Sequence, residues 1–259
     1  MVESPSSKKK NYPGETFSPL RHSTSLAVGA TFELFAFQLD QLALREVNVK
    51  EAFSIVDTNG IAHRASLLSN DGKTARAKVY ETLPSSPESP LDLTLYCCVL
   101  SRQRMITVVQ KATELGVHTL VPVLSDYSVA PADLEKEKPW AWQGQAIRAT
   151  KQCRRTRVPV VTSVTTLGEV FHSERWRTHD VRFLLDDRMD NMFVPTKDTA
   201  RKPLNAGLFV GPEGGFSDRE RALLVDASAE NIRLGSRVLR AETAVYAGLT
   251  LLQHWLGDM

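Results

Sequence analysis

Two glycine-bearing segments in the last quarter of the chain have the residue types and spacing to bind a small molecule. Residues 211–216 read GPEGGF, and residues 234–239 read LGSRVL. Each segment follows a short apolar run and precedes a helical pattern, so each predicts a loop between a strand and a helix. Open α/β sheets bind small molecules at such loops, where glycine lets the backbone approach a ligand closely. The two segments together predict one ligand held between them.

The first segment does not match a standard nucleotide-binding motif. It lacks the Gly-Lys-Ser/Thr of a Walker A loop and the G-x-G-x-x-G of a dinucleotide-binding loop. Ser217 and Glu220 form the S-x-x-E pattern of a capping box, which predicts that a helix begins beside this segment. Taken alone, the glycines favour a plain turn, and the ligand stays open.

The composition and the cysteines set broad limits. The chain has 259 residues, of which 42% are hydrophobic and 24% charged, with a net charge of +2, as in an ordinary soluble globular protein. No apolar run approaches the roughly 18 residues of a membrane span, and no apolar stretch of a secretory signal follows the lysines at 8–10. The three cysteines have no metal-ligand spacing and indicate a reducing compartment. Cys97 and Cys98 are neighbours in an expected strand, so they should point to opposite faces.

The apolar pattern divides the chain into a β-rich part and a part where strands and helices alternate. We expect residues 1–18 to form a flexible tail, residues 19–82 a small β-barrel or sandwich, and the Pro- and Ser-rich residues 83–90 a linker. From residue 91 to 259, the alternation predicts a mainly parallel sheet covered on both faces. The expected strands are 32–37, 52–56, 62–68, 75–80, 92–100, 118–124, 158–163, 181–186, 206–210 and 231–234, and the expected helices are 102–115, 136–152, 166–175, 218–229 and 240–256.

Charged residues gather in two places where they could contact phosphate groups. In residues 148–157 the cluster fits phosphate contacts and, equally well, a solvated helix end whose cations complement the helix dipole. On the expected helix 102–115, a polar stripe is read as an ordinary solvated face in preference to an RNA-facing one. The basic cluster comprises Arg148, Lys151, Arg154, Arg155 and Arg157, and the stripe comprises Arg104, Thr107, Lys111 and Glu114.

The last expected helix, 240–256, is apolar nearly all round, which indicates a buried helix. A stripe of small residues lets another element approach its backbone closely, either inside the domain or in a partner subunit. These residues are Ala241, Ala244, Ala247 and Gly248.

Three segments in a fixed order give the sequence a resemblance to a known family. They are residues 110–116 (QKATELG), residues 211–216 and residues 234–244 (LGSRVLRAETA). Together they resemble the ribosomal RNA small subunit methyltransferase E family of the SPOUT superfamily, whose members methylate N3 of a uridine in 16S rRNA. Three motifs in register are far more specific than any one of them. The resemblance covers residues 88–256 in sequence and the β-rich part only in architecture.

The resemblance implies a fold, a cofactor and an assembly. It implies a SPOUT-type α/β domain with a deep trefoil knot over residues 91–259, and a PUA-like β-barrel that binds RNA over residues 19–82. It also implies S-adenosyl-L-methionine as cofactor, 16S rRNA in the small ribosomal subunit as substrate, a homodimer, and a cytoplasmic location without membrane or metal. The cofactor-binding residues carried over are Phe209, Gly211, Gly214, Gly215, Leu234, Gly235, Val238 and Leu239.

Methylation at uridine N3, if the resemblance holds, needs groups that handle the N3 proton or the uridine anion. We assign anion stabilisation to Arg240 and Arg237, while Glu242 would orient an arginine or act as the base. A structural ion pair between Arg240 and Glu242 explains those two residues equally well. The expected RNA contacts are Arg104, Lys111, Arg154, Arg155 and Arg157.

Two other functions remain open. A SPOUT methyltransferase that acts on another rRNA site or on a tRNA would carry the same cofactor segments. A non-catalytic RNA-binding relative would retain the knot without the activity. The family's pattern changes at residues 40–45 (DQLALR) and 152–155 (QCRR), which fall on the expected RNA-facing side.

Overall fold

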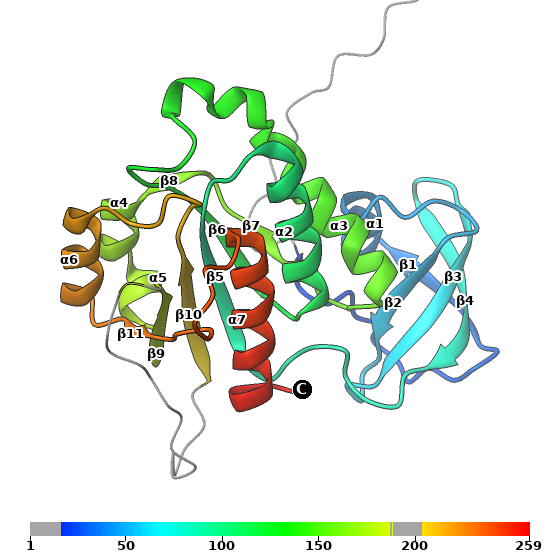
Figure 1. The fold of residues 1–259 in the computed structure, drawn as a ribbon. Coiled ribbons are helices and arrows are strands. Elements are labelled where there is room, and N and C mark those ends of the chain that lie inside the picture. Colours follow the sequence, from blue (N-terminus) through cyan, green and yellow to red (C-terminus); the bar gives the residue numbers. More distant parts are fainter. Residues whose placement is uncertain (1–16, 187, 189–203) are drawn as a thin grey trace, which may run out of the picture.

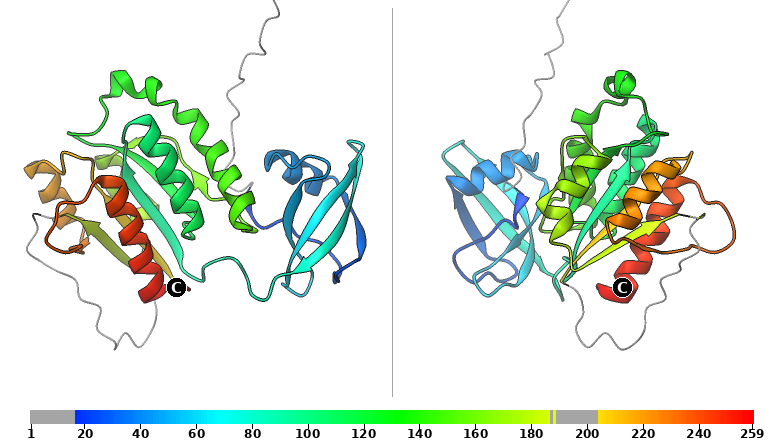
Figure 2. Two further views of the ribbon diagram at one scale, coloured as in Figure 1. Left: turned by 45° about the vertical axis from the view of Figure 1, so that its right-hand side comes forward. Right: turned by 90° about the vertical axis from the view of Figure 1, so that its left-hand side faces the viewer.

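Two β-sheets, one antiparallel and one parallel, organise the chain (Figure 1). The computed structural model describes residues 17–186, 188 and 204–259. Figure 2 shows the two sheets side by side, with the chain crossing from one to the other. No helix in the described ranges is both long and apolar enough to cross a membrane.

The four strands of the antiparallel sheet lie close to the predicted strand ranges. Its elements are β1 (Thr31–Phe35), helix α1 (Phe37–Leu44), β2 (Ala52–Val56), β3 (Ala62–Asn70) and β4 (Thr74–Thr82), with the strands in the order β1-β4-β3-β2. Buried and exposed residues alternate along β1 and β4, so one face of the sheet packs on a core and the other faces outward. Helix α1 departs from the prediction: the strand ends at Phe35 because Ala36, with φ +42°, interrupts the extended backbone.

The parallel sheet confirms the predicted alternation of strands and helices. Its strands run in the order β11-β9-β10-β5-β6-β7, and β8 pairs with β6. The elements are β5 (Asp92–Cys98), α2 (Arg102–Glu114), β6 (Thr119–Leu124), η2 (Pro131–Glu137), η3 (Pro139–Ala141), α3 (Trp142–Cys153), β7 (Val160–Val161), β8 (Thr165–Thr166), α4 (Leu167–His172), α5 (Glu174–Arg177), β9 (Val181–Leu185), β10 (Asn205–Val210), α6 (Asp218–Asp226), β11 (Glu230–Asn231) and α7 (Ala241–Leu256).

Two expected helices differ from the prediction in ways their residues explain. The helix expected from residue 136 begins at Trp142, because 3-10 turns that start at Pro131 and Pro139 occupy the preceding stretch. The helix expected over 166–175 divides into α4 and α5 at Ser173. This residue is extended (φ −72°, ψ 145°), and its side chain accepts a hydrogen bond from the N–H of Trp176, which starts a new helix.

Helices cover both faces of the parallel sheet, and each face has its own core. Helices α2, α3 and α7 pack on one face, whereas α4 and α6 pack on the other (Figure 1). Neighbouring residues of β5 belong to different cores: Cys97 lies in the first and Cys98 in the second, as the alternation along a strand predicts. The small-residue stripe of α7 is used in the first core, where Gly248 is buried. A Cβ at Gly248 would lie 2.7 Å from Cδ1 of Leu185.

Residues 83–90 connect the two sheets, and hydrogen bonds hold the end of this stretch. The Glu88 carboxylate accepts hydrogen bonds from Nη2 of Arg155 (2.7 Å) and from the N–H of Thr156 (2.8 Å). Ser89 donates to Oε1 of Gln253 at 2.8 Å. The expected tail, 1–18, lies outside the described residues except for its last two. Phe17 is buried in the core of the parallel sheet, so the tail prediction is wrong at that residue.

Candidate functional site

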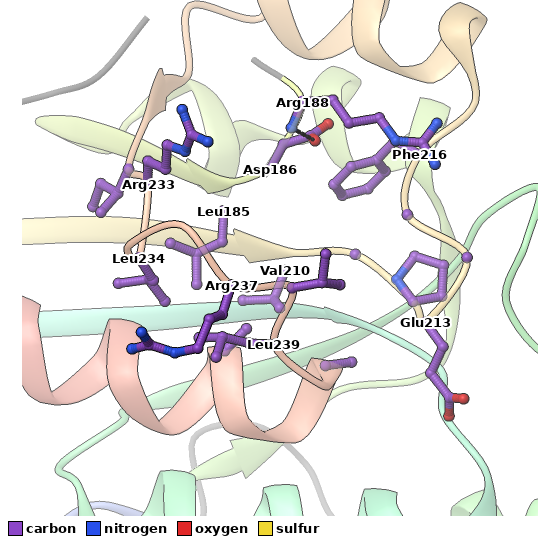
Figure 3. A pocket seen from close by; sticks show the side chains of 18 of the residues that line it. Leu185, Asp186, Arg188, Val210, Glu213, Phe216, Arg233, Leu234, Arg237 and Leu239 are labelled. Carbon is purple, nitrogen blue, oxygen red and sulfur yellow. Dashed lines mark hydrogen bonds between the residues drawn. The ribbon is translucent and has the colours of Figure 1, made fainter. Parts of the chain in front are cut away.

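The structure brings the two glycine segments together around one cavity of about 210 Å³ (Figure 3). The cavity lies beyond the carboxyl ends of β9 and β10, where the loop after β10 and the loop after β11 meet the start of α7. This is the edge at which open parallel sheets bind ligands. The lining residues are Leu185, Asp186, Arg188, Val210, Gly211, Pro212, Glu213, Gly214, Gly215, Phe216, Ile232, Arg233, Leu234, Gly235, Arg237, Val238, Leu239, Ala241 and Ala244.

The first wall, residues 211–216, is shaped by contacts that exclude side chains at its glycines. A Cβ at Gly211 would lie 2.8 Å from the buried ring of Phe216, and a Cβ at Gly214 would lie 2.9 Å from Cβ of Tyr127. Gly215 has φ +70°, a backbone conformation that residues other than glycine adopt only with strain. Packing and backbone conformation within the wall therefore require these glycines, and the glycines also bring backbone groups to the cavity.

The helix that follows the first wall begins as the capping-box pattern predicts. Oε2 of Glu220 accepts from the N–H of Ser217 at 3.0 Å, and the Ser217 hydroxyl accepts from the N–H of Glu220 at 3.3 Å. Oε1 of Glu220 also accepts from the N–H of Asp126 at 2.8 Å. These bonds fix the end of the first wall to the loop after β6.

The second wall, residues 234–239, joins β11 to α7. Gly235 has φ +80°, which turns the chain, and Arg240 is the extended N-cap of α7 (φ −63°, ψ 150°). Val238 is 83% exposed, an unusual environment for an apolar side chain beside a cavity. This wall therefore offers backbone groups and an uncovered apolar surface to a ligand.

Seven of the eight residues assigned to the cofactor line the cavity, and Phe209 does not. Phe209 is fully buried and stacks on Tyr96, with ring centroids 5.8 Å apart. Along β10 the side chains alternate, so its neighbour Val210 lines the cavity instead. Asp186, at the end of β9, is a lining residue that the sequence reasoning missed. Its position at the carboxyl end of an expected strand could have pointed to it.

Asp186 places a fixed carboxylate at the cavity. It is 7% exposed, and its Oδ2 accepts from Nε of Arg221 at 2.8 Å. Oδ1 accepts from the N–H of Arg188 at 2.9 Å. A carboxylate held by partners on both oxygens can orient a polar group of a ligand without moving itself.

The three residues assigned to catalysis take different positions. Arg237 lines the cavity, and Arg240 is exposed at the start of α7. Glu242 faces α2, where its Oε1 lies 3.8 Å from Nε of Arg104. Within the described part of the chain, the alternative of an Arg240–Glu242 ion pair is wrong, since Glu242 pairs with Arg104. Arg240 is thus left available for a substrate.

Two titratable groups in the core on the α2 and α7 side of the parallel sheet have raised pKa values. Burial raises the pKa of the Cys97 thiol to about 12. Burial and then the nearby Glu242 carboxylate raise the pKa of Tyr246 to about 12. Neither group can therefore act as a base near neutral pH. Within the described ranges, no group of three or more His, Cys, Asp or Glu side chains is placed to hold a metal ion.

The predicted RNA contacts are mostly engaged in ion pairs within the protein. The assignment of Arg155 to RNA is wrong: its side chain is 3% exposed and pairs with Glu88 at 2.7 Å. Nη1 of Arg155 also donates to the carbonyls of Thr113 and Val117. Three other predicted RNA contacts also form ion pairs: Lys111 with Glu114 (2.8 Å), Arg154 with Glu81 (3.0 Å), and Arg104 with Glu213 and Glu242. Lys151 of the basic cluster pairs with Glu51 at 2.8 Å.

Comparison with known proteins decides the family. Residues 87–253 match the family model of the RNA methyltransferase domain. The chain belongs to this family. The matched range contains both walls of the cavity and most of α7, so the cavity is a feature of the methyltransferase domain itself.

The similar proteins extend over nearly the whole chain. Ribosomal RNA small subunit methyltransferase E of Aquifex aeolicus is 27% identical over 219 residues, which is 84% of this chain and 92% of that protein. The protein of the same name from Neisseria gonorrhoeae, solved bound to S-adenosyl methionine, is 28% identical with a TM-score of 0.65, over 93% of this chain and 100% of that one. A Legionella pneumophila methyltransferase, solved with bound SAM, is 25% identical with the same TM-score and the same coverage.

Proposed function

We propose that this protein transfers a methyl group from S-adenosyl-L-methionine to N3 of a uridine in small-subunit rRNA. The observation that carries the proposal is the single cavity formed by the two glycine segments in an RNA methyltransferase domain. The similar proteins named above as small-subunit rRNA methyltransferases, one of them solved with the cofactor, support both the donor and the class of RNA.

The residues of the cavity fit this cofactor. Gly211 and Gly214 bring backbone to the cavity without side chains, which would collide with Phe216 and Tyr127. Such open backbone can hold the polar edge of an adenine ring. The apolar lining residues Leu185, Val210, Ile232 and Leu239 can pack on its faces, while Asp186 can accept from a hydroxyl or ammonium group. When bound, the cofactor supplies an activated methyl group, so the protein mainly has to position the reactants.

We assign the handling of the uridine to Arg240 and Arg237. Uridine N3 is a poor nucleophile until it loses its proton, and cationic donors stabilise the anion that forms. Arg237 is a lining residue and Arg240 is exposed one helical turn from Ala244, another lining residue. Glu242 pairs with Arg104, which favours a role for Glu242 in holding Arg104 over a role as the base.

The antiparallel sheet is proposed to bind RNA as a PUA-like domain over residues 19–82. The exposed positions of β4 alternate with buried ones and carry Arg76, Lys78 and Tyr80. Two cations and an aromatic ring on one sheet face suit phosphate contacts and base stacking. In the basic cluster, Arg157 remains an RNA candidate, because its side chain has no ion-pair partner among the described residues.

We further propose the SPOUT-type trefoil knot and the homodimer implied by the family resemblance. The order β11-β9-β10 supports the knot, since the chain travels to the far edge of the sheet and returns to place α7 beside β10. Ala244 and Ala247 of the small-residue stripe are only partly buried, which leaves room for a partner subunit at α7.

Nucleoside mass spectrometry tests the proposed reaction. Purified protein is incubated with labelled S-adenosyl-L-methionine and either small-subunit rRNA, assembled small subunits, large-subunit rRNA or tRNA. We expect labelled 3-methyluridine from a small-subunit substrate. Label in tRNA or large-subunit rRNA would favour the related enzyme with another target. Cofactor binding without label in any RNA would favour a non-catalytic RNA-binding protein.

A further inference from the structure

Arg104 lies where the first wall of the cavity and the start of α7 meet helix α2. Its Nη1 forms an ion pair with Oε1 of Glu213, and its Nε lies 3.8 Å from Oε1 of Glu242. One guanidinium therefore faces two carboxylates that come from different segments. The arginine is in the first turn of α2, which is anchored in the core by the buried Met105 and Val108.

Each of the two carboxylates belongs to one side of the cavity. Glu213 is part of the first wall, and Figure 3 shows its side chain extending away from the second-wall residues Leu234 and Arg237. Glu242 is in the first turn of α7, immediately after the second wall, between the lining residues Ala241 and Ala244. Arg104 thus joins the first wall to the start of α7, which continues directly from the second wall, and it does so from outside the cavity.

The link between Glu213 and Glu242 depends on the positive charge of Arg104, because both partners are carboxylates. Oε2 of Glu242 is buried without a hydrogen-bond partner in the described residues, so Arg104 is the cation that balances this carboxylate. The side chains of Arg104 and Glu242 are 30% and 18% exposed, which limits screening by water and salt. Without the guanidinium, the Glu213 and Glu242 carboxylates would repel each other. The planar fork of arginine can serve two acceptors, whereas lysine is a point charge.

We propose that Arg104 is a positioning residue of the cofactor cavity, which holds the two walls at the spacing that the cofactor needs. Its ion pairs with Glu213 and Glu242 replace the RNA contact that its sequence position suggested. The inference rests on the proposed function, because the cofactor has to bind between these walls. It assigns Arg104 no contact with the cofactor or the RNA.

Calorimetry with S-adenosyl-L-methionine in the absence of RNA tests the inference. Arg104→Gln should weaken cofactor binding about fivefold, the scale of a lost ion pair between partly exposed side chains. Arg104→Lys should have an intermediate effect. Lys111→Gln is the matched control, since it removes a cation of the same helix whose one ion-pair partner among the described residues is Glu114, and it should bind the cofactor as the wild type does.

Glu213→Gln guards against a folding defect in the Arg104 variants. The Glu213 side chain is 54% exposed, so its loss should leave the fold intact while removing the same link. The effects of Arg104→Gln and Glu213→Gln should be less than additive in the double variant.

The outcomes separate the inference from the function on which it rests. No cofactor binding by the wild type would contradict the proposed function. Wild-type binding with unchanged affinity in Arg104→Gln would overturn the inference alone. A loss of RNA affinity without any change in cofactor affinity would also overturn it, by showing that Arg104 contacts RNA.

Discussion

Arginines that look alike in the sequence have opposite fates in the structure. Arg155 and Arg157 stand two residues apart in one basic cluster. The Arg155 side chain is 3% exposed and binds Glu88 and two carbonyls, whereas Arg157 is half-buried and has no ion-pair partner among the described residues. Arg240 is exposed beside the cavity. Charge and spacing predict where cations gather, but not which of them meet a carboxylate from a distant segment. The partner of Arg155 comes from the connecting stretch between the sheets, and no local pattern indicates that pairing.

Removing the buried cation should destabilise the fold. Arg155→Met leaves the Glu88 carboxylate without its charged partner, which should lower the free energy of unfolding by about 3 kcal/mol. Arg157→Met is the matched control and should change it by less than about 0.5 kcal/mol. Urea unfolding followed by circular dichroism measures both values. Equal effects of the two changes would contradict a structural role for Arg155.

Removing the exposed cation should affect the reaction instead. Arg240→Ala takes away a donor assigned to the uridine anion, so methyl transfer should fall by about 100-fold to 1,000-fold. Cofactor affinity and the unfolding transition should stay unchanged. Arg219→Ala, an exposed change on α6, serves as the control. Unchanged single-turnover methyl transfer by Arg240→Ala would remove this residue from the mechanism.

At the scale of elements, the strand-helix loops were the most predictable part of the site. Apolar runs, the capping box and the glycines place both walls, because each signal is local. The sequence prediction does not include Asp186, and it assigns Phe209 to the cavity where the structure places Val210. When all residues of a short strand are apolar and buried, the sequence does not indicate which of them point to which face of the sheet. Strand β10 is buried along most of its length. Helix α1 is missed because one residue, Ala36, changes the backbone direction.

The first wall should tolerate no side chain at Gly211. In Gly211→Ala, the new Cβ would lie 2.8 Å from the Phe216 ring, which is 1% exposed and has little room to move. We expect a loss of about 1–3 kcal/mol in unfolding free energy and at least about tenfold weaker cofactor binding. Gly168→Ala, where a Cβ meets open space, is the control. Thermal unfolding with and without cofactor measures both effects, and a neutral Gly211→Ala would contradict the close packing of this wall.

At the scale of the whole molecule, ion pairs hold the antiparallel sheet against the methyltransferase domain. Lys151 and Arg154, at the end of α3, pair with Glu51 and Glu81 near β2 and β4. Ser54 adds a hydrogen bond to the carbonyl of Arg154 at 2.7 Å. The basic cluster thus orients the proposed RNA-binding sheet relative to the cavity. The sequence reveals the basic cluster, but it does not distinguish cations that form ion pairs within the protein from cations that contact phosphate groups.

Loosening this contact should impair RNA recognition and spare the cofactor. In the double variant Lys151→Gln/Arg154→Gln, we expect the two sheets to move apart and the KM for RNA to rise. Small-angle X-ray scattering should show a larger radius of gyration, and calorimetry an unchanged cofactor affinity. Lys136→Gln, which removes an exposed pair with Asp133, is the control. An unchanged radius with an unchanged KM would contradict the orienting role.

The same contact should depend on pH through Glu51. The hydrogen bond from Lys151 is the largest cause that lowers the pKa of Glu51, followed by the N–H of Asn48. A lowered pKa means that the contact is fully formed above the ordinary pKa of a glutamate and is lost as the pH falls through the lowered value. NMR titration of the Glu51 side chain should show its pKa rising in Lys151→Gln. No rise would mean that Lys151 does not hold the carboxylate.

The central claim is that the two glycine walls enclose the methyl donor, and a crystal structure with S-adenosyl-L-methionine tests it most directly. We predict density for the cofactor in the cavity between residues 211–216 and 234–239, with its adenine against the backbone of these walls. Density at another site, or an empty cavity at millimolar cofactor, would contradict the account.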